Sequence, residues 1–222
     1  MLPNKLPEAI VFDLDGTLVD SVRGITHALN MMIERRGGER LELSTVRCLI
    51  SMGAHELLRR ALGRLYRSPN EEAKEFRTIY TGVPHGPEDL FPGALACVTS
   101  LRARGIKLGV CTNKPQLLAE SLMCQTNLLD QFAVLIGGRD DLPPKPAREP
   151  LTAALSSLGV TTGTAIFVGD SEVDEQTARA AGVPFVLAEY GYPIGDINRI
   201  PCAARFSSFQ HLDSLLSRAV ST

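Results

Sequence analysis

The sequence predicts an α/β fold in which a doubly wound parallel sheet carries an inserted helical domain. Apolar runs typical of buried strands alternate with helical patterns along much of the chain, as in right-handed β–α–β crossovers. Consecutive helical patterns between residues 20 and 89 interrupt this alternation directly after the first strand. We therefore expect one sheet-based core and one helical lobe.

Five short apolar runs are the predicted strands. Four of them are rich in β-branched or aromatic residues, and none alternates strictly between apolar and polar positions, which is typical of parallel strands buried on both faces. The runs cover residues 9–15, 106–113, 133–138, 164–170 and 184–189.

Four helical patterns accompany the later strands. The first has Leu95, Val98 and Leu101 on one face and ends at Gly105, a common C-terminal stop. A further helix is expected to pack on the core at residues 207–220. The four patterns cover residues 93–105, 115–129, 148–159 and 173–182.

The helical lobe is the predicted second domain. Loops rich in glycine and proline, near residues 86–87 and 91–93, return the chain from the lobe to the sheet. We expect residues 1–19 and 90–222 to form the α/β core and residues 20–89 to form a helical cap.

Composition limits the partners of the protein. The chain has 222 residues and a net charge of −2, which gives no basic field to attract nucleic acid. No apolar run approaches the roughly 20 residues that a membrane-spanning helix needs, so no membrane partner is expected. The five cysteines have no CxxC spacing and are expected to be free thiols of a cytoplasmic protein. The oligomeric state is left open.

Acidic residues stand at the ends of the first and fourth predicted strands. Asp13 and Asp15 lie in "VFDLDGTLVDS", and Asp170 is followed four residues later by Asp174. Ligands bind at the carboxyl ends of parallel strands, so Asp13, Asp15 and Asp170 are expected to crowd at one sheet edge. Such crowding favours a hard divalent cation with oxygen ligands, and Mg²⁺ is the expected cofactor.

Polar and basic residues at the same edge complete an anion site. Thr112 and Asn113 end the second strand, and Lys145 stands between Pro144 and Pro146. Taken singly, each has an ordinary structural explanation, such as a helix cap or a solvated loop lysine. Together with the acids at that edge, they indicate a site for a phosphoryl group.

These motifs resemble those of the haloacid dehalogenase-like superfamily, and the resemblance covers essentially the whole chain. The four segments that carry it are "FDLDGTLVD", "CTNK", Lys145-Pro146 and "GDSEVD". The helical insertion resembles that superfamily's C1 cap, and "FPGALACVTSLRARGIKLGVCTNKP" is similar to its phosphoglycolate phosphatase branch. The resemblance implies a Mg²⁺-dependent phosphatase acting on a small phosphorylated metabolite.

The resemblance also implies a role for each core residue. Asp13 is the expected nucleophile, which forms an aspartyl-phosphate. Asp15 is expected to protonate the leaving alcohol and then to activate water as a base. Thr112 and Asn113 are expected to hold the phosphoryl group, and Lys145 is expected to neutralise charge on the nucleophile and the phosphate.

The metal ligands implied by the resemblance are Asp13, Asp170 and the backbone carbonyl of Asp15. Asp174 is expected to support them, in a pair with Lys145. The superfamily's dehalogenases typically lack an acid at the position of Asp15 and need no metal, so dehalogenation is not expected here.

Substrate choice is expected to lie in the cap. The candidates are the segment Ser51-Met52-Gly53, where the phosphatases that this chain resembles usually carry a glycine-rich turn, and His55.

Other functions would use the same core. A sugar phosphomutase of the β-phosphoglucomutase type is one alternative, and a pyrophosphatase or nucleotidase is another. A non-catalytic sensor of phosphorylated ligands is disfavoured, because such a protein would be expected to lose Asp13 or Asp15 and both are present.

Overall fold

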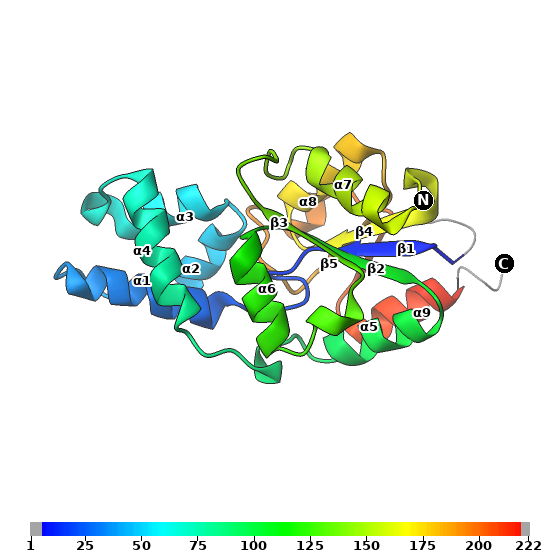
Figure 1. Ribbon diagram of the computed structural model, residues 1–222, viewed down its shortest axis with the longest axis horizontal. Helices are drawn as coiled ribbons and strands as arrows, with labels where there is room; N and C mark the ends of the chain where they lie inside the picture. The colour runs from blue at the N-terminus through cyan, green and yellow to red at the C-terminus, as the bar shows by residue number, and fades with distance from the viewer. Residues whose placement is uncertain (1–5, 219–222) are drawn as a thin grey trace.

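The structure is a computed structural model that describes residues 6–218. Its larger part is built on a six-stranded sheet in the order β3-β2-β1-β4-β5-β6, with every neighbouring pair parallel (Figure 1). The predicted doubly wound sheet with a helical insertion is confirmed. The strands are β1 (Ala9–Phe12), β2 (Lys107–Pro115), β3 (Val134–Gly138), β4 (Ala165–Gly169), β5 (Phe185–Ala188) and β6 (Ala204–Phe206).

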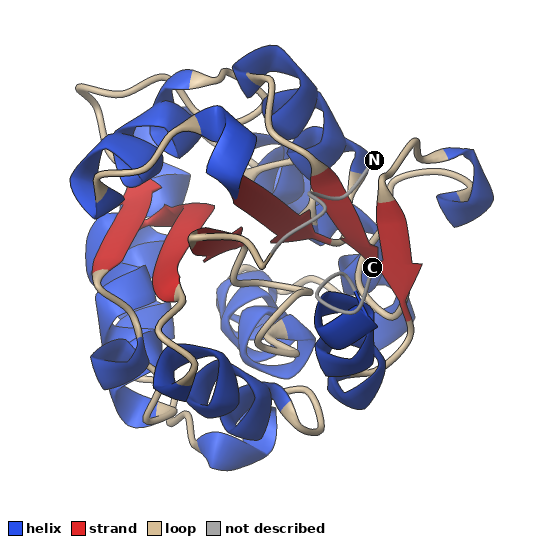
Figure 2. Ribbon diagram, turned by 90° about the vertical axis from the view of Figure 1, so that its right-hand side faces the viewer, coloured by secondary structure: helices blue, strands red, loops and turns tan. Residues whose placement is uncertain are grey.

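Helices cover both faces of the sheet (Figure 2). Alternate residues of β1 point to opposite faces, so Ile10 and Phe12 join one core cluster while Ala9 and Val11 join the other. Helices α5, α6 and α9 pack on the first face, and α7 and α8 pack on the second. Their bounds are α5 (Ala94–Ala103), α6 (Gln116–Gln125), α7 (Glu149–Leu158), α8 (Glu172–Ala181) and α9 (Phe209–Arg218).

Four helices form a lobe beyond the carboxyl ends of the strands (Figure 1). This helical lobe has its own apolar cluster, which includes Leu29, Met32 and Leu58. Leu118 of α6 and Tyr192 of the core belong to the same cluster, so the lobe is seated on the core through apolar contacts. The helices are α1 (Val22–Arg35), α2 (Leu43–Ile50), α3 (Ala54–Leu62) and α4 (Pro69–Thr81).

Three details differ from the sequence prediction. Strand β2 continues to Pro115, so the helix expected from that residue begins at Gln116 and ends at Gln125. Strand β6 was not predicted, because its three residues at the sheet edge are too few to show a periodic pattern. The C-terminal helix expected at residues 207–220 is described from Phe209, and residues 219–220 lie outside the described residues.

No helix within residues 6–218 is long and apolar enough to cross a membrane. The five cysteines are free thiols, as expected.

Candidate active site

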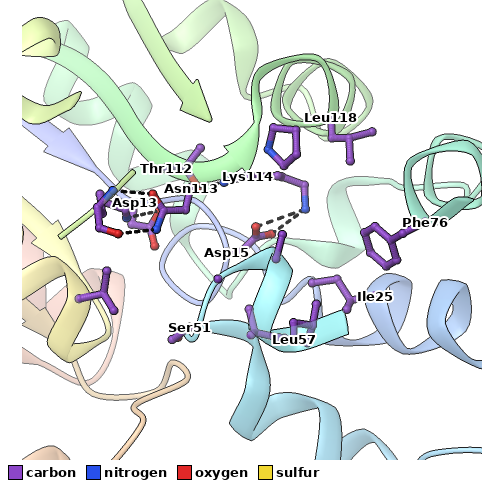
Figure 3. A pocket seen from close by; sticks show the side chains of 16 residues that line it. Asp13, Asp15, Ile25, Ser51, Leu57, Phe76, Thr112, Asn113, Lys114 and Leu118 are labelled. Atoms are coloured by element: carbon purple, nitrogen blue, oxygen red, sulfur yellow. Dashed lines mark hydrogen bonds and ion pairs between the residues drawn. The ribbon is translucent and has the colours of Figure 1, made fainter. Parts of the chain in front are cut away.

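A pocket of about 660 Å³, part of it open to solvent, lies between the carboxyl ends of the central strands and the helical lobe. Its polar end belongs to the core and its apolar end belongs largely to the lobe (Figure 3). The polar lining includes Asp13, Asp15, Thr112, Asn113, Lys114 and Lys145, and the apolar lining from the lobe includes Ile25, Ile50, Ala54, Leu57 and Phe76.

Asp13 follows β1 directly and is buried at the polar end. Its backbone N–H donates to the carbonyl of Val168 at 2.8 Å, which extends the pairing of the two central strands. Its Oδ1 forms an ion pair with Lys145 Nζ at 2.9 Å, and among the described residues it accepts no hydrogen bond. Burial raises the pKa of Asp13 to about 7, against the opposing charge of Lys145.

Lys145 bridges two buried carboxylates. Its Nζ lies 2.9 Å from Asp13 Oδ1 and donates to Asp174 Oδ1 at 2.6 Å. Burial opposes the ammonium charge, but Asp13 and Asp174 together raise the pKa of Lys145 above its usual value. The other oxygen of Asp174 accepts from the Ser171 hydroxyl at 2.7 Å. Asp174 therefore fixes Lys145 against the nucleophile candidate.

Asp170 follows β4 directly and is fully buried. Its Oδ1 accepts from the Thr17 hydroxyl at 2.9 Å, and its Oδ2 accepts from the Tyr192 N–H at 2.6 Å. Burial raises its pKa well above the usual value, and the neighbouring Asp174 and Asp13 add to the shift. Two hydrogen bonds thus fix the position of the Asp170 carboxylate, although burial makes its ionised form less favourable than in water.

The residues present fit a divalent cation. One oxygen each from Asp13, Asp170 and Asp174 lies within 4.8 Å of the other two. All three groups offer hard carboxylate oxygens, the ligands that hard divalent cations prefer. Among the described residues, Asp13 Oδ1 accepts no hydrogen bond and has only its ion pair with Lys145. This buried cluster can hold a metal ion.

Gly16 allows the loop after β1 to close on this cluster. Its φ of +86° lies in the left-handed region, and a Cβ atom there would collide with the carboxylate of Asp170 and the ring of Tyr192. A side chain at this position would therefore displace one wall of the cation site.

The carboxylate of Asp15 makes its contacts away from the cation cluster, with Lys114 (Figure 3). Lys114 Nζ donates to the two carboxylate oxygens at 3.1 and 3.2 Å and to the hydroxyl of Tyr80 at 3.0 Å. Sequence reasoning placed Lys114 in the motif "CTNK" but gave it no role. The available signal was its place in that motif, directly after Thr112 and Asn113 at the end of the second predicted strand.

Asn113 and Thr112 line the pocket and also support its frame. Asn113 donates to the Lys145 carbonyl at 3.0 Å and accepts from the Lys145 N–H at 2.8 Å, so its side chain anchors the Lys145 loop to β2. Thr112 Oγ1 accepts from the backbone N–H of Lys114 at 3.2 Å. Contact of Thr112 and Asn113 with a phosphoryl group stays a prediction.

The candidates in the helical lobe divide into two pairs. Ser51 and Gly53 line the pocket. Met52 and His55 are not among the described residues that line it, and His55 Nδ1 instead lies 3.3 Å from the hydroxyl of Tyr66. A role in substrate choice stays a prediction for all four.

Tyr192 was missed by sequence reasoning because no motif marks it. Its backbone carbonyl accepts from the Ser51 hydroxyl at 2.7 Å, and its N–H donates to Asp170. Its hydroxyl hydrogen-bonds the carboxylate of Asp20, just before α1. This single buried residue contacts the cation cluster, the start of the helical lobe and the candidate specificity segment.

Comparison with known proteins agrees with this geometry. Residues 10–188 match the family model of haloacid dehalogenase-like hydrolases. A phosphoglycolate phosphatase of Rhodospirillum rubrum is 38% identical over 95% of this chain and 91% of its own length. A phosphoglycolate phosphatase of Cereibacter sphaeroides is 36% identical over 94% of this chain and 97% of its own.

Solved structures share the fold. The crystal structure of a predicted phosphoglycolate phosphatase from Haemophilus somnus 129PT superposes with a TM-score of 0.83, at 25% identity over 97% of this chain and 99% of that chain. The resemblance inferred from the motifs is confirmed. The chain belongs to the haloacid dehalogenase-like hydrolase family, as an enzyme of the phosphatase type homologous to phosphoglycolate phosphatases.

Proposed function

We propose that this protein is a Mg²⁺-dependent phosphomonoesterase that acts on a small phosphorylated metabolite of the 2-phosphoglycolate kind. One arrangement supports it most directly: the Asp13 carboxylate lies beside both Lys145 and the acids Asp170 and Asp174, at the polar end of a pocket that also contains Asp15. The curated relatives that match the chain over nearly its whole length are phosphoglycolate phosphatases.

The first half of the reaction uses Asp13 as nucleophile. Its carboxylate oxygen attacks the phosphorus atom and forms an acyl phosphate, while the bond to the ester oxygen breaks and the alcohol leaves. Asp15 donates its proton to that oxygen. Lys145, 2.9 Å from Asp13 Oδ1, neutralises negative charge as nucleophile and phosphoryl group approach each other.

The second half releases inorganic phosphate. Asp15, now a carboxylate, takes a proton from a water molecule whose oxygen attacks the phosphorus atom. The bond between phosphorus and Asp13 breaks, which returns the free carboxylate. Lys114, at 3.1 Å from Asp15, keeps this carboxylate aimed from the side of the leaving group in both steps.

The proposed ligands of Mg²⁺ are Asp13, Asp170 and the backbone carbonyl of Asp15, with Asp174 in support. When bound, the cation supplies charge neutralisation for the phosphoryl oxygens. Thr112 and Asn113 are proposed to orient the phosphoryl group from the end of β2.

We propose that the helical lobe, residues 20–89, acts as a cap over this site. It places apolar side chains such as Ile25, Leu57 and Phe76 opposite the polar residues, so a bound substrate would be shielded from water on that side. Ser51 and Gly53 are the lobe's proposed contacts to the leaving group.

The testing experiment measures phosphate release from a panel of phosphorylated compounds, with and without Mg²⁺, for wild type and Asp13→Asn. The panel contains 2-phosphoglycolate, sugar monophosphates, nucleoside monophosphates and pyrophosphate. We expect Mg²⁺-dependent release that is highest for 2-phosphoglycolate and abolished in Asp13→Asn. Phosphate release that persists in Asp13→Asn contradicts the proposal. Conversion of one sugar phosphate into its isomer without release of phosphate identifies a mutase instead.

A further inference from the structure

We propose that Tyr192 is a positioning residue that joins the seating of the helical lobe to the affinity of the cation cluster. The inference rests on the cation site of the proposed function, and it gives a loop outside the sequence motifs a part in forming that site. It is carried by the contacts of Tyr192, whose backbone faces the cluster while its side chain faces the lobe.

The backbone of the loop after β5 lies directly against Asp170. The Tyr192 N–H donates to Asp170 Oδ2 at 2.6 Å, and the Thr17 hydroxyl donates to Oδ1 at 2.9 Å. A Cβ atom at Gly191 would collide with the Asp170 side chain, so the loop approaches as closely as a glycine permits. Because Asp170 is fully buried, its carboxylate depends on these two donors for its position. A shift of the loop therefore changes the geometry of the cation cluster.

The side chain of Tyr192 is fixed from the opposite direction, by the segment that enters the lobe. Its hydroxyl donates to the carboxylate of Asp20 and accepts from the Val22 N–H at 3.3 Å. The ring is 1% exposed and belongs to the apolar cluster of the lobe. The guanidinium carbon of Arg47 lies 4.9 Å from the centre of this ring, and Arg47 also pairs with Asp20 at 3.4 Å. The lobe thus holds this side chain by hydrogen bonds, apolar packing and a cation over the ring.

Asp20 stands where the two linkers between core and lobe meet. Its N–H donates to the carbonyl of Asp89, in the returning linker, at 2.7 Å. Beside it, Val19 pairs with Leu90 in an antiparallel bridge. A change in the seating of the lobe moves this junction, and the hydroxyl of Tyr192 transmits that movement to the loop beside the cation cluster.

These contacts imply an effect in both directions. A seated lobe fixes Tyr192, which in turn holds Asp170 where it can ligate a cation. By linkage, a bound cation favours the seated lobe by the same factor. Loss of the side-chain contacts of Tyr192 should therefore weaken cation binding, although no proposed ligand of the cation is changed.

Calorimetry with Mg²⁺ tests this in wild type, Tyr192→Phe, Asp20→Ala and the double variant. Tyr192→Phe removes the hydroxyl and keeps the ring and the backbone N–H, whereas Asp20→Ala removes the acceptor of that hydroxyl. We expect each single variant to raise the Kd for Mg²⁺ about five- to twentyfold, the lower part of the range typical of coupling between two sites. The double variant should raise it no further, because both changes break the same contact. Tyr66→Phe, which removes a hydroxyl that faces His55 within the lobe, is the control and should keep the wild-type Kd.

Hydrogen exchange separates positioning from simple packing. The Asp20 N–H is bonded to the Asp89 carbonyl, a contact that Tyr192→Phe leaves in place. In wild type, we expect saturating Mg²⁺ to slow the exchange of this N–H by about the same five- to twentyfold factor, and in Tyr192→Phe to leave it nearly unchanged. If Tyr192 only stabilises the fold, Tyr192→Phe lowers Tm but keeps the wild-type Kd and the wild-type response of exchange to Mg²⁺. That result overturns the inference.

The binding results also distinguish failure of this inference from failure of the proposed function. Binding of Mg²⁺ to wild type with the same Kd in Tyr192→Phe and Asp20→Ala overturns the role of Tyr192 and leaves the proposed phosphatase standing. A raised Kd in these variants supports that role even if wild type releases no phosphate from any compound of the panel, and Asp20→Ala carries the test should Tyr192→Phe fold poorly. Absence of Mg²⁺ binding to wild type overturns both.

Discussion

The hydroxyl of Ser51 donates a hydrogen bond to the backbone carbonyl of Tyr192, with 2.7 Å between the two oxygens. Ser51 lies at the end of α2 in the helical lobe, and Tyr192 lies in the core loop after β5. The N–H of Tyr192 donates to Asp170 at 2.6 Å, so this loop residue contacts both the lobe and the cation cluster. The position of the lobe and the geometry of the cluster are thus connected through one backbone unit.

Ser51→Ala removes the bond between lobe and core without changing the polar end of the pocket. A neutral hydrogen bond contributes about 0.5–1.5 kcal/mol, so we expect kcat/KM to fall by about two- to tenfold, through weaker seating of the lobe together with loss of the proposed Ser51 contact to the leaving group. Steady-state kinetics with the best substrate measures this fall. Ser44→Ala, at an exposed position of the same helix, should leave kcat/KM unchanged. Equal kinetics for Ser51→Ala and wild type would show that the bond does not support turnover.

The sequence predicted which strand ends meet because the rule for parallel sheets is general. Strand β1 lies between β2 and β4, so Asp13 and Asp170, each one residue beyond its strand, lie at the same sheet edge. The stretch of helices after β1 likewise predicted the helical lobe. These inferences needed only local patterns and the known handedness of crossovers.

The contacts of single side chains across the fold were beyond that reasoning. Lys114 meets Asp15, 99 positions earlier in the chain, and Tyr80, 34 positions earlier. Tyr192 meets Asp170 from 22 positions away, in a segment with no recognisable motif. Such pairs depend on how the lobe and the loops pack in three dimensions, which periodicity does not encode. For the same reason, the sequence did not show that His55 is exposed and lies against Tyr66 instead of lining the pocket.

Lys145→Met is expected to destabilise the fold as well as abolish turnover. Lys145 is buried between Asp13 and Asp174, and its removal leaves two acids without their shared cation. Loss of one partner from a buried ion pair costs about 3–5 kcal/mol, and urea unfolding in the absence of Mg²⁺ measures the change. Lys74→Met, at the surface, should change the free energy of unfolding by about 0.5 kcal/mol or less. If Lys145→Met lowers the free energy of unfolding no more than Lys74→Met does, the bridge between Asp13 and Asp174 does not stabilise the fold.

Mg²⁺ is expected to stabilise the folded protein through the cluster of Asp13, Asp170 and Asp174. A ligand that binds only the folded state at 100 times its Kd raises the free energy of unfolding by about 2.7 kcal/mol. Thermal unfolding with and without Mg²⁺ measures this as a rise in Tm. Asp170→Asn should lose most of the rise, whereas Asp130→Asn, at an exposed position, should keep it. If Mg²⁺ raises the Tm of both variants equally, the cation binds at a site other than this cluster.

The stability of the metal-free protein is expected to depend on the protonation of Asp13. Burial raises the pKa of this carboxyl from 3.8 to about 7, so the folded state binds its proton more tightly than the unfolded state. Between these two values the folded state carries the extra proton, and the free energy of unfolding falls as the pH rises. Above the folded-state value the full cost of a buried, ionised Asp13 is present.

Asp13→Asn isolates this contribution, because an amide cannot ionise. In the presence of a chelator, we expect the Tm of the variant relative to wild type to increase from pH 4 to pH 7, in line with the shift from 3.8 to about 7, and then to level off. Mg²⁺ should abolish the slope, since a bound cation stabilises the ionised carboxylate. A difference in Tm that stays constant from pH 4 to pH 8 would show that Asp13 titrates alike in the folded and unfolded states.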